Sequence, residues 1–407
     1  MKQSGTADLP LHYGKVPLWL AERMSTLGLA IIESIIIEYG RAEVLRRLSD
    51  PFWFQSMGAV MGMDWHSSGI TTSVMGALKR SVNARSRELG LYICGGKGKS
   101  SLLTPAELLL VAERTGLDGD LLVRSSKLSA KVDNTAVQDG FQLYMHSFIV
   151  SSDGDWTVVQ QGMRQGSATA RRYHWHSVGL QSFLDDPHTS IYGQHLGSII
   201  NLADSQASGA RSNMVSITTE SPERMMREIK RLVMPSHHDV RTKDVDLKRL
   251  GAMLWVAHDQ GSEKFEDLLM LTGMGPRTLQ SLALVSEVIY GSPTRFSDPA
   301  RFSFAHGGKD GHPFPVPLKV YDDTIQVLRK AVDGARLGQS DKIDAVRRLS
   351  KLSEAAESSF TPTSSLDVLI ERERRDSGRY GGRTVFGSEP PVNDTPPPVR
   401  DTQLKLF

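Results

Sequence analysis

The sequence contains a single cysteine, Cys94, among its 407 residues. One cysteine excludes an intrachain disulfide framework and a zinc module built from several cysteines. The longest apolar stretch, Leu27–Ile37, is interrupted by Glu33 and is too short to span a bilayer. The first residues also lack the apolar core of a signal peptide. These absences predict a cytoplasmic protein with no membrane contact.

Neither positive nor negative charge predominates in the sequence. The 48 basic and 46 acidic residues leave a net charge of +2, so the total neither requires nor excludes nucleic acid. Only the placement of the charges can decide that question. The composition is that of an ordinary globular protein, and the length predicts about two to four domains.

Hydrophobic periodicity and turn signals predict an α+β fold. The pattern indicates helices over 16–40, 41–48, 71–81, 104–116 and 125–138. Alternating residues indicate two strands, 141–150 and 155–163, joined by a hairpin turn at Ser151–Gly154. The segment from Pro51 up to the helix predicted at 71 is expected to be a strand or loop. The segment 89–101 is expected to be a strand followed by a glycine loop.

Three domains are expected along the chain. Residues 1–235 form the mixed α+β domain with antiparallel hairpin strands, and 240–358 form a mostly helical domain. From residue 361 the composition shifts to Gly, Pro and polar residues, which predicts a disordered tail over 361–407.

The clearest motif lies at 262–291, where two predicted helices flank Leu271–Arg277. Gly273 and Gly275 let the turn approach a phosphodiester backbone closely, and the following helix offers free N–H groups to a phosphate. Arg277 adds positive charge. This pattern predicts a helix-hairpin-helix that binds the DNA backbone, with an ordinary αα-hairpin as the alternative.

A glycine loop follows the strand predicted at 90–94. It carries Lys97 and Lys99, but it fails the Walker A spacing because Ile93 stands where the first glycine belongs. An NTPase is therefore excluded. The loop is expected either to bind a DNA phosphate or to be a solvated loop.

The densest polar segment surrounds the first predicted strand. Asp133 and Asp139 are hard oxygen ligands suited to Mg²⁺ or Mn²⁺, and Asp64 in the segment DWHSS is a third candidate. His146 is expected on one strand face with Gln142, Tyr144 and Phe148, and Val158 and Gln160 of the partner strand are expected on the same face of the sheet. His146 is either a further metal ligand or a proton donor. The alternative is a polar core network or a dimer interface.

The segment RRYHWH interleaves cations with aromatic rings. Arg171, Arg172 and His174 in this segment suit phosphate binding and base stacking, although a structural arginine pair is the alternative. In the hypothesis of a metal-dependent nuclease, His146 or His174 protonates the leaving oxygen. Lys131, Arg171 and Arg172 stabilise the charge on the phosphate.

The chain ends in an apolar pentapeptide after a polar, Pro-containing segment. Gln403, Leu404, Leu406 and Phe407 resemble the motif by which bacterial proteins bind the DNA sliding clamp. Lys405 departs from that motif, which has a small or acidic residue at its third position.

Several long strings, among them MDWHSSGITT, QDGFQLYMHSF, VVQQGM and ARRYHW, are similar to a prokaryotic domain-of-unknown-function family, number 763. The resemblance covers about residues 12–335 and implies a DNA-processing protein with nuclease activity and a role in repair. The main hypothesis is therefore a metal-dependent DNA nuclease that is tethered to the sliding clamp. A homodimer is one of the assemblies that this hypothesis allows. The alternative is a non-catalytic DNA-structure-binding adaptor for repair factors.

Overall fold

The structure, a computed structural model, describes residues 9–10, 16–63, 68–164, 169–231, 247–301, 318–335, 338–358, 375, 383–384 and 387–388. The chain divides into two compact units, Met1–Phe360 and Thr361–Phe407. In the second unit the described strands are β11 (Arg383–Thr384) and β12 (Gly387–Ser388), which pair antiparallel. The expected domain boundary at 235–240 lies outside the described residues.

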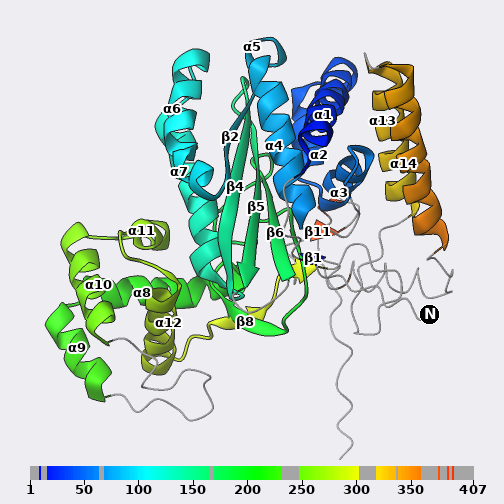
Figure 1. Cartoon of the computed structure of the whole chain (residues 1–407). Coiled ribbons are helices and arrows are strands. Elements are labelled where there is room, and N and C mark those ends of the chain that lie inside the picture. The colour runs from blue at the N-terminus through cyan, green and yellow to red at the C-terminus, as the bar shows by residue number, and fades with distance from the viewer. Residues whose placement is uncertain are drawn as a thin grey trace, which may run out of the picture. The chain divides into compact units, whose positions relative to one another are not determined.

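A mostly antiparallel sheet forms the centre of the first unit (Figure 1). The strand order is β10-β7-β6-β5-β4-β2, and β1 pairs with β6. The bounds are β1 (Leu9–Pro10), β2 (Leu91–Lys97), β4 (Phe141–Ser151), β5 (Trp156–Arg164), β6 (Thr169–His176), β7 (Ser190–Tyr192) and β10 (Ala300–Arg301). A smaller sheet contains β3 (Val137–Gln138), β8 (Ser198–Asn201) and β9 (Arg295–Ser297). The α+β class and the predicted β4–β5 hairpin are confirmed.

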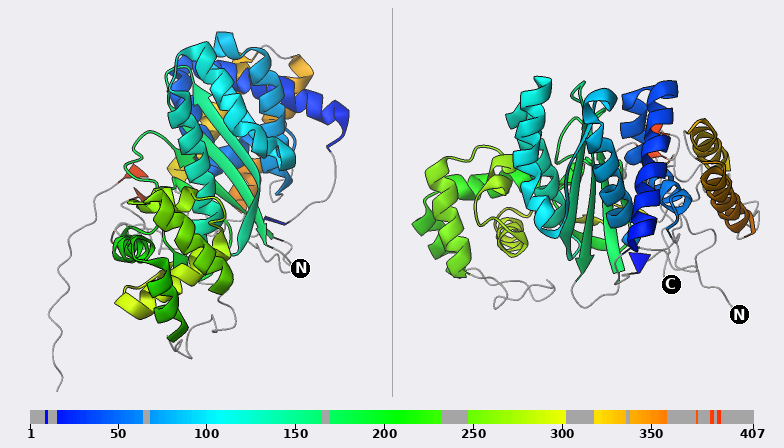
Figure 2. Two further views of the ribbon diagram at one scale, coloured as in Figure 1. Left: turned by 90° about the vertical axis from the view of Figure 1, so that its left-hand side faces the viewer. Right: turned by 45° about the horizontal axis from the view of Figure 1, so that its top comes forward.

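One face of the large sheet packs against N-terminal helices, and two late helices pack on those helices. Ile93, Met145, Ile149 and Val159 from the strands enter this core. The helices are α1 (Leu18–Tyr39), α2 (Arg41–Leu48), α3 (Pro51–Val60), α4 (Gly69–Ala84), α5 (Ser86–Leu89), α13 (Leu318–Gly334) and α14 (Gln339–Ser358). Figure 2 shows α13 and α14 beside the N-terminal helices.

Helix α3 differs from the expected strand or loop. Its start is fixed by Asp50, whose Oδ1 accepts hydrogen bonds from the amides of Phe52 (2.8 Å) and Trp53 (2.9 Å). Pro51 at the first helical position loses no hydrogen bond there. A side-chain cap followed by proline therefore outweighs the aromatic, Gly-containing composition that suggested extended structure.

The helices in the middle of the chain share one apolar core with the other sheet face; the first two of them pack on the strands, and the others continue that core beyond them. The helices are α6 (Thr104–Thr115), α7 (Gly119–Lys131), α8 (Ser208–Thr219), α9 (Pro222–Arg231), α10 (Leu247–Gln260), α11 (Phe265–Met270) and α12 (Pro276–Tyr290). Short turns of helix are η1 (Gly98–Leu103), the π-helical η2 (Val132–Ala136) and η3 (Ser205–Ala207). The described helices of 240–358 are therefore shared between two cores, because α10–α12 belong to this core and α13–α14 belong to the core of the N-terminal helices.

A β-bulge at Tyr144 decides which polar side chains share a face. His146 pairs with Gln160, and Phe148 pairs with Val158, so these four lie on the face toward α7, as predicted. The register shifts between Leu143 and Met145. This shift places Gln142 and Tyr144 on the opposite face, contrary to the expected alternation, because a bulge inserts one extra residue into the period of two.

Among the described residues, no helix combines the length and the apolar character that a membrane span requires.

Candidate functional site

A chain of buried hydrogen bonds runs from α7 along one face of the sheet to η2. His146 Nδ1 lies 2.8 Å from Gln160 Oε1, and Nε2 lies 2.8 Å from Ser126 Oγ. Because the amide oxygen can only accept, Nδ1 carries the proton and Nε2 accepts from the Ser126 hydroxyl. Gln160 Nε2 then donates to Asp133 Oδ2 over 2.6 Å. We call Ser126, His146, Gln160, Asp133 and His188 the buried network.

Asp133 ends this network. Its Oδ2 also accepts from Trp175 Nε1 (3.0 Å), and its Oδ1 lies 2.5 Å from His188 Nε2. Burial raises the pKa of Asp133, and the neighbouring His188 and Trp175 oppose that shift. Burial also lowers the pKa of His146 to about 4, so this imidazole is neutral near pH 7. The ring is buried, its Nδ1–H is bonded to Gln160 and its Nε2 accepts from Ser126, so no N–H is directed toward a leaving group. The geometry therefore does not support a general-acid role.

Asp139 lies in a separate buried cluster on the same sheet face. Its Oδ2 accepts from Arg171 Nη1 (2.8 Å) and from the Tyr173 hydroxyl (2.6 Å), and its Oδ1 accepts from the Phe141 amide (2.9 Å). Asp298 Oδ2 receives Arg171 Nη2 at 2.7 Å. Burial lowers the pKa of Arg171, but the two carboxylates outweigh it and raise that pKa. One arginine thus holds two buried acids.

The residues present fit a divalent metal poorly. Asp133 and Asp139 each accept three hydrogen bonds from protein donors and share none of them. Within the described ranges, His, Cys, Asp and Glu side chains form no group of three that could hold a metal. Asp64, the third predicted ligand, lies outside the described residues.

The structure places Arg172 and His174 on the opposite sheet face from Asp133. Arg172 Nε donates to His174 Nε2 (2.9 Å), and Arg172 Nη2 donates to Gln55 Oε1 (2.9 Å). Burial lowers the pKa of Arg172 to about 10, and burial together with Arg172 lowers the pKa of His174 well below its usual value. Arg171, Arg172 and His174 are all fully buried, so these three side chains have no access to the phosphate that the sequence predicted them to contact.

Lys131 is at the turn between α11 and α12 instead of beside either acid. Its Nζ donates to the carbonyl of Met274 (2.7 Å), and Gln138 Nε2 donates to the carbonyl of Pro276 (2.9 Å). Burial lowers the pKa of Lys131. These two hydrogen bonds join the segment on either side of η2 to residues 271–277, which we call the hairpin turn.

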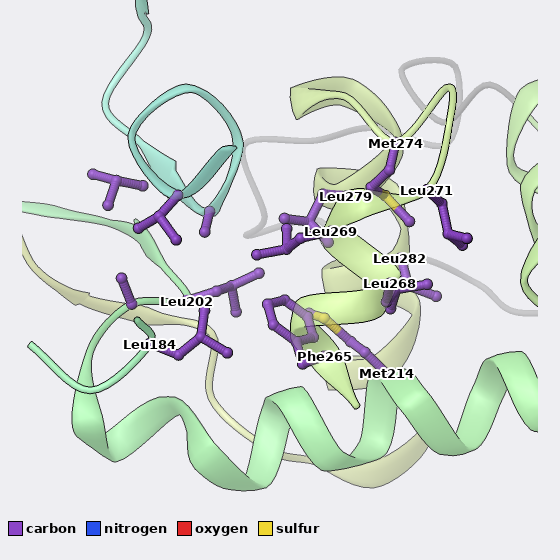
Figure 3. Packing of buried hydrophobic residues seen from close by; sticks show 14 of the residues in the cluster. Leu184, Leu202, Met214, Phe265, Leu268, Leu269, Leu271, Met274, Leu279 and Leu282 are labelled. Carbon is purple, nitrogen blue, oxygen red and sulfur yellow. The ribbon is translucent and has the colours of Figure 1, made fainter. Parts of the chain in front are cut away.

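The hairpin turn has a buried side and an exposed side. Met274 is 2% exposed and packs in the core with leucines of α11 and α12 (Figure 3). Gly273 and Arg277 are exposed, and Gly275 is half-buried. In the described part of the chain, no acceptor takes the amide N–H of Gly273 or Gly275. Gly275 is the N-cap of α12, and Pro276 is at its first helical position.

The glycine loop after β2 is also at the surface. Lys97 and Lys99 are exposed, and Lys97 Nζ lies 5.9 Å from the centre of the Tyr144 ring. Residues 98–103 form a 3₁₀ turn, so this segment is more regular than the predicted loop. The tail residues Gln403, Leu404, Leu406 and Phe407 lie outside the described residues.

Sequence reasoning did not find His188 or Asp298, although both complete the buried clusters. His188 reaches Asp133 across 55 positions of sequence, and Asp298 reaches Arg171 across 127. Neither residue belongs to a local pattern of charge or spacing that would have indicated a site. Asp139 and Arg171 were predicted to act on a ligand, but the structure shows them neutralising each other.

Comparison with family models places residues 5–316 of the chain in "Protein of unknown function (DUF763)". No curated protein matches the chain, and no solved structure matches it. The family model covers most of the sequence, including the buried network, the β4–β5 hairpin and the hairpin turn. The chain is a member of the DUF763 family.

Proposed function

We propose that this protein binds the sugar–phosphate backbone of DNA through the hairpin turn, which acts as a helix-hairpin-helix. The observation that carries the proposal is the exposed turn itself. The amides of Gly273 and Gly275 have no acceptor among the described residues, and Arg277 is exposed beside them. They lie at the start of α12, a helix of 15 residues whose N-terminal end favours an anion.

The hydrogen bonds that hold the hairpin turn in place use its carbonyl groups, which favours a partner rich in hydrogen-bond acceptors. The carbonyls of Met274 and Pro276 point toward Lys131 and Gln138 and accept hydrogen bonds from them. The amides of Gly273 and Gly275 are free donors, whereas the carbonyl of Gly275 accepts from the Leu279 amide. A surface that offers donors and a cation is complementary to phosphate oxygens and carries no means of reading base sequence.

The space in front of the turn supports close approach. A Cβ added to Gly275 would meet no atom within 4 Å, so the protein itself does not require glycine for packing there. Its backbone is extended (φ −124°), which other residues also adopt. A glycine that neither packing nor backbone conformation requires is consistent with a ligand that approaches the main chain closely.

The geometry favours the DNA-structure-binding adaptor over the metal-dependent nuclease. The carboxylates of Asp133 and Asp139 are satisfied by protein donors, whereas the hairpin turn presents donors without an acceptor among the described residues. The nuclease, its Mg²⁺ or Mn²⁺ and the repair role stay predictions.

Fluorescence anisotropy with the full chain tests the proposal. Labelled single-stranded, duplex and forked DNA are titrated in EDTA and again in Mn²⁺, and each mixture is then resolved on a denaturing gel. We expect binding in both conditions with no preference for base sequence, and intact strands. Binding confined to one sequence contradicts backbone recognition. Metal-dependent cleavage that is lost in Asp133→Asn and Asp139→Asn contradicts the adaptor and supports the nuclease.

Association with the sliding clamp also stays a prediction. Deleting residues 403–407 is expected to leave DNA affinity unchanged and to remove clamp binding. Calorimetry of a tail peptide against a bacterial sliding clamp measures this contact, with Leu406 and Phe407 changed to Ala as the control. Equal heats from both peptides contradict the resemblance.

A further inference from the structure

The turn between β2 and α6 presents two leucines to solvent. Leu102 is 79% exposed and Leu103 is 55% exposed, and both follow the exposed Lys97 and Lys99. Single exposed leucines are ordinary on protein surfaces. Two adjacent ones at the end of a glycine- and lysine-rich turn combine apolar side chains with cations at one place. We call residues 97–103 the leucine turn.

The leucine turn is held in place by hydrogen bonds on both sides. Ser101 Oγ donates to the carbonyl of Gly98 (2.6 Å), and Thr104 Oγ1 donates to the carbonyl of Ser101 (2.7 Å). Glu107 of α6 accepts from the Gly95 amide (2.6 Å). The two leucines therefore project from a preorganised support, which lowers the entropy lost when they contact a partner.

Lys79 strengthens that support. Its Nζ donates to the Gly95 carbonyl (2.7 Å) and to Glu107 Oε1 (2.8 Å), so the end of β2 and the first turn of α6 are tied together. Gly95 cannot be replaced without a clash, because a Cβ there would lie 2.2 Å from the His146 carbonyl oxygen. The leucine turn thus begins at a fixed point of the sheet.

We propose that Leu102 and Leu103 form a wedge that inserts between neighbouring bases of DNA, while Lys97 and Lys99 contact the flanking phosphates. The inference rests on the proposed function. Apolar side chains that enter a base step unstack it, and the aliphatic side chains of leucine are suited to this contact. The two lysines favour a polyanion over an apolar protein surface as the occupant.

The position of the wedge agrees with a DNA that also contacts the hairpin turn. The helix α6 that follows the leucine turn packs on α7, and α7 is joined to the hairpin turn through Lys131. Lys127 of α7 is also exposed and adds a positive charge to these two helices.

Forked DNA with 2-aminopurine at the first paired position reports base unstacking by an increase in fluorescence. The full chain is added at saturating concentration. We expect the wild type to raise the fluorescence and the double variant Leu102→Ser, Leu103→Ser to lose that rise, with affinity reduced less than about tenfold. Leu121→Ser is the matched control, because Leu121 is also 60% exposed but lies on α7 outside the leucine turn.

The outcomes separate the wedge from the proposed function. Normal DNA binding by the wild type with no change in fluorescence overturns the wedge alone. A double variant that changes the sedimentation coefficient of the free protein overturns it too, because the leucines then cover a second copy of the chain. No DNA binding by the wild type overturns the proposed function and the wedge with it. Lys97→Ala, Lys99→Ala should weaken affinity and retain the fluorescence rise at saturation.

Discussion

The buried network and the hairpin turn are built from similar polar groups, but their hydrogen-bonding states are opposite. Asp133, Gln160 and His146 have less than a tenth of their surface exposed, and each is bonded to its neighbours in the network. Gly273 and Gly275 lie in a surface turn, and their amides have no described acceptor. The two regions are connected, because Lys131 precedes η2 and bonds to Met274.

This difference assigns the two regions different tasks. A satisfied polar network in a core fixes one arrangement of the elements it joins, since breaking any bond leaves a buried group unpaired. Here it fixes η2, which lies between the two residues that bond the hairpin turn, Lys131 and Gln138. The unsatisfied donors of the turn are the groups available to a ligand. We infer that the buried network positions the turn and that the turn makes the contact.

The largest effect is expected from removing the cation between two buried acids. Arg171→Met leaves Asp139 and Asp298 without their cation in a fully buried site. We expect the free energy of unfolding to fall by about 3–5 kcal/mol. Urea denaturation followed by circular dichroism measures it.

An exposed ion pair is the control for that variant. Arg347 and Asp344 lie 2.9 Å apart, with side chains 63% and 42% exposed. Arg347→Ala is expected to change the free energy of unfolding by less than about 0.5 kcal/mol. Equal losses in the two variants would show that the Asp139–Arg171–Asp298 cluster contributes no more than a surface pair.

The next effect is a pH dependence caused by His146. Its pKa in the folded protein is about 4, below the usual value of 6.5. Between these two pH values, His146 therefore binds a proton more readily in the unfolded chain than in the folded protein. The contribution of the neutral His146 to the free energy of unfolding is fully present above about pH 6.5. This contribution is lost as the pH falls toward 4, at up to roughly 1.4 kcal/mol per pH unit. His146→Gln should therefore show a shallower decline of unfolding free energy over this window than the wild type. Parallel pH curves for the two proteins would contradict a buried neutral imidazole.

The elements that depend on short-range sequence patterns, in both the buried network and the hairpin turn, could be predicted from the sequence. The strands around His146 and Gln160 and the turn at Gly273–Gly275 follow from alternation, glycine spacing and Pro276. The bulge at Tyr144 left no local signal, since it changes the pairing without changing the composition. Pairings such as Asp133 with His188 depend on tertiary structure. Burial was therefore the property that sequence reasoning missed, and it separates a structural carboxylate from a metal ligand.

A third effect concerns close approach of the DNA backbone. Gly275→Val places a branched side chain where the structure has open space, so the free energy of unfolding should change little. The added methyl groups keep a phosphate away from the turn, and we expect DNA affinity to fall roughly tenfold, or about 1.4 kcal/mol. Gly76→Ala in α4 is the control, because it adds a methyl group on the other side of the sheet with only Arg80 nearby. Unchanged anisotropy titrations for Gly275→Val would remove the hairpin turn from the interface.

The smallest effect is expected from a single phosphate contact. Arg277 is exposed and has no acidic partner in the described residues, so Arg277→Ala should leave the fold unaffected. Each lost phosphate contact makes the slope of log affinity against log salt concentration shallower by about one unit. Titrations at several salt concentrations, on two unrelated duplex sequences, measure that slope. We expect the same decrease on both sequences, since a backbone contact is indifferent to the bases. A decrease on only one of them would mean that Arg277 reads a base edge, and the hairpin turn would then contribute specificity as well as position.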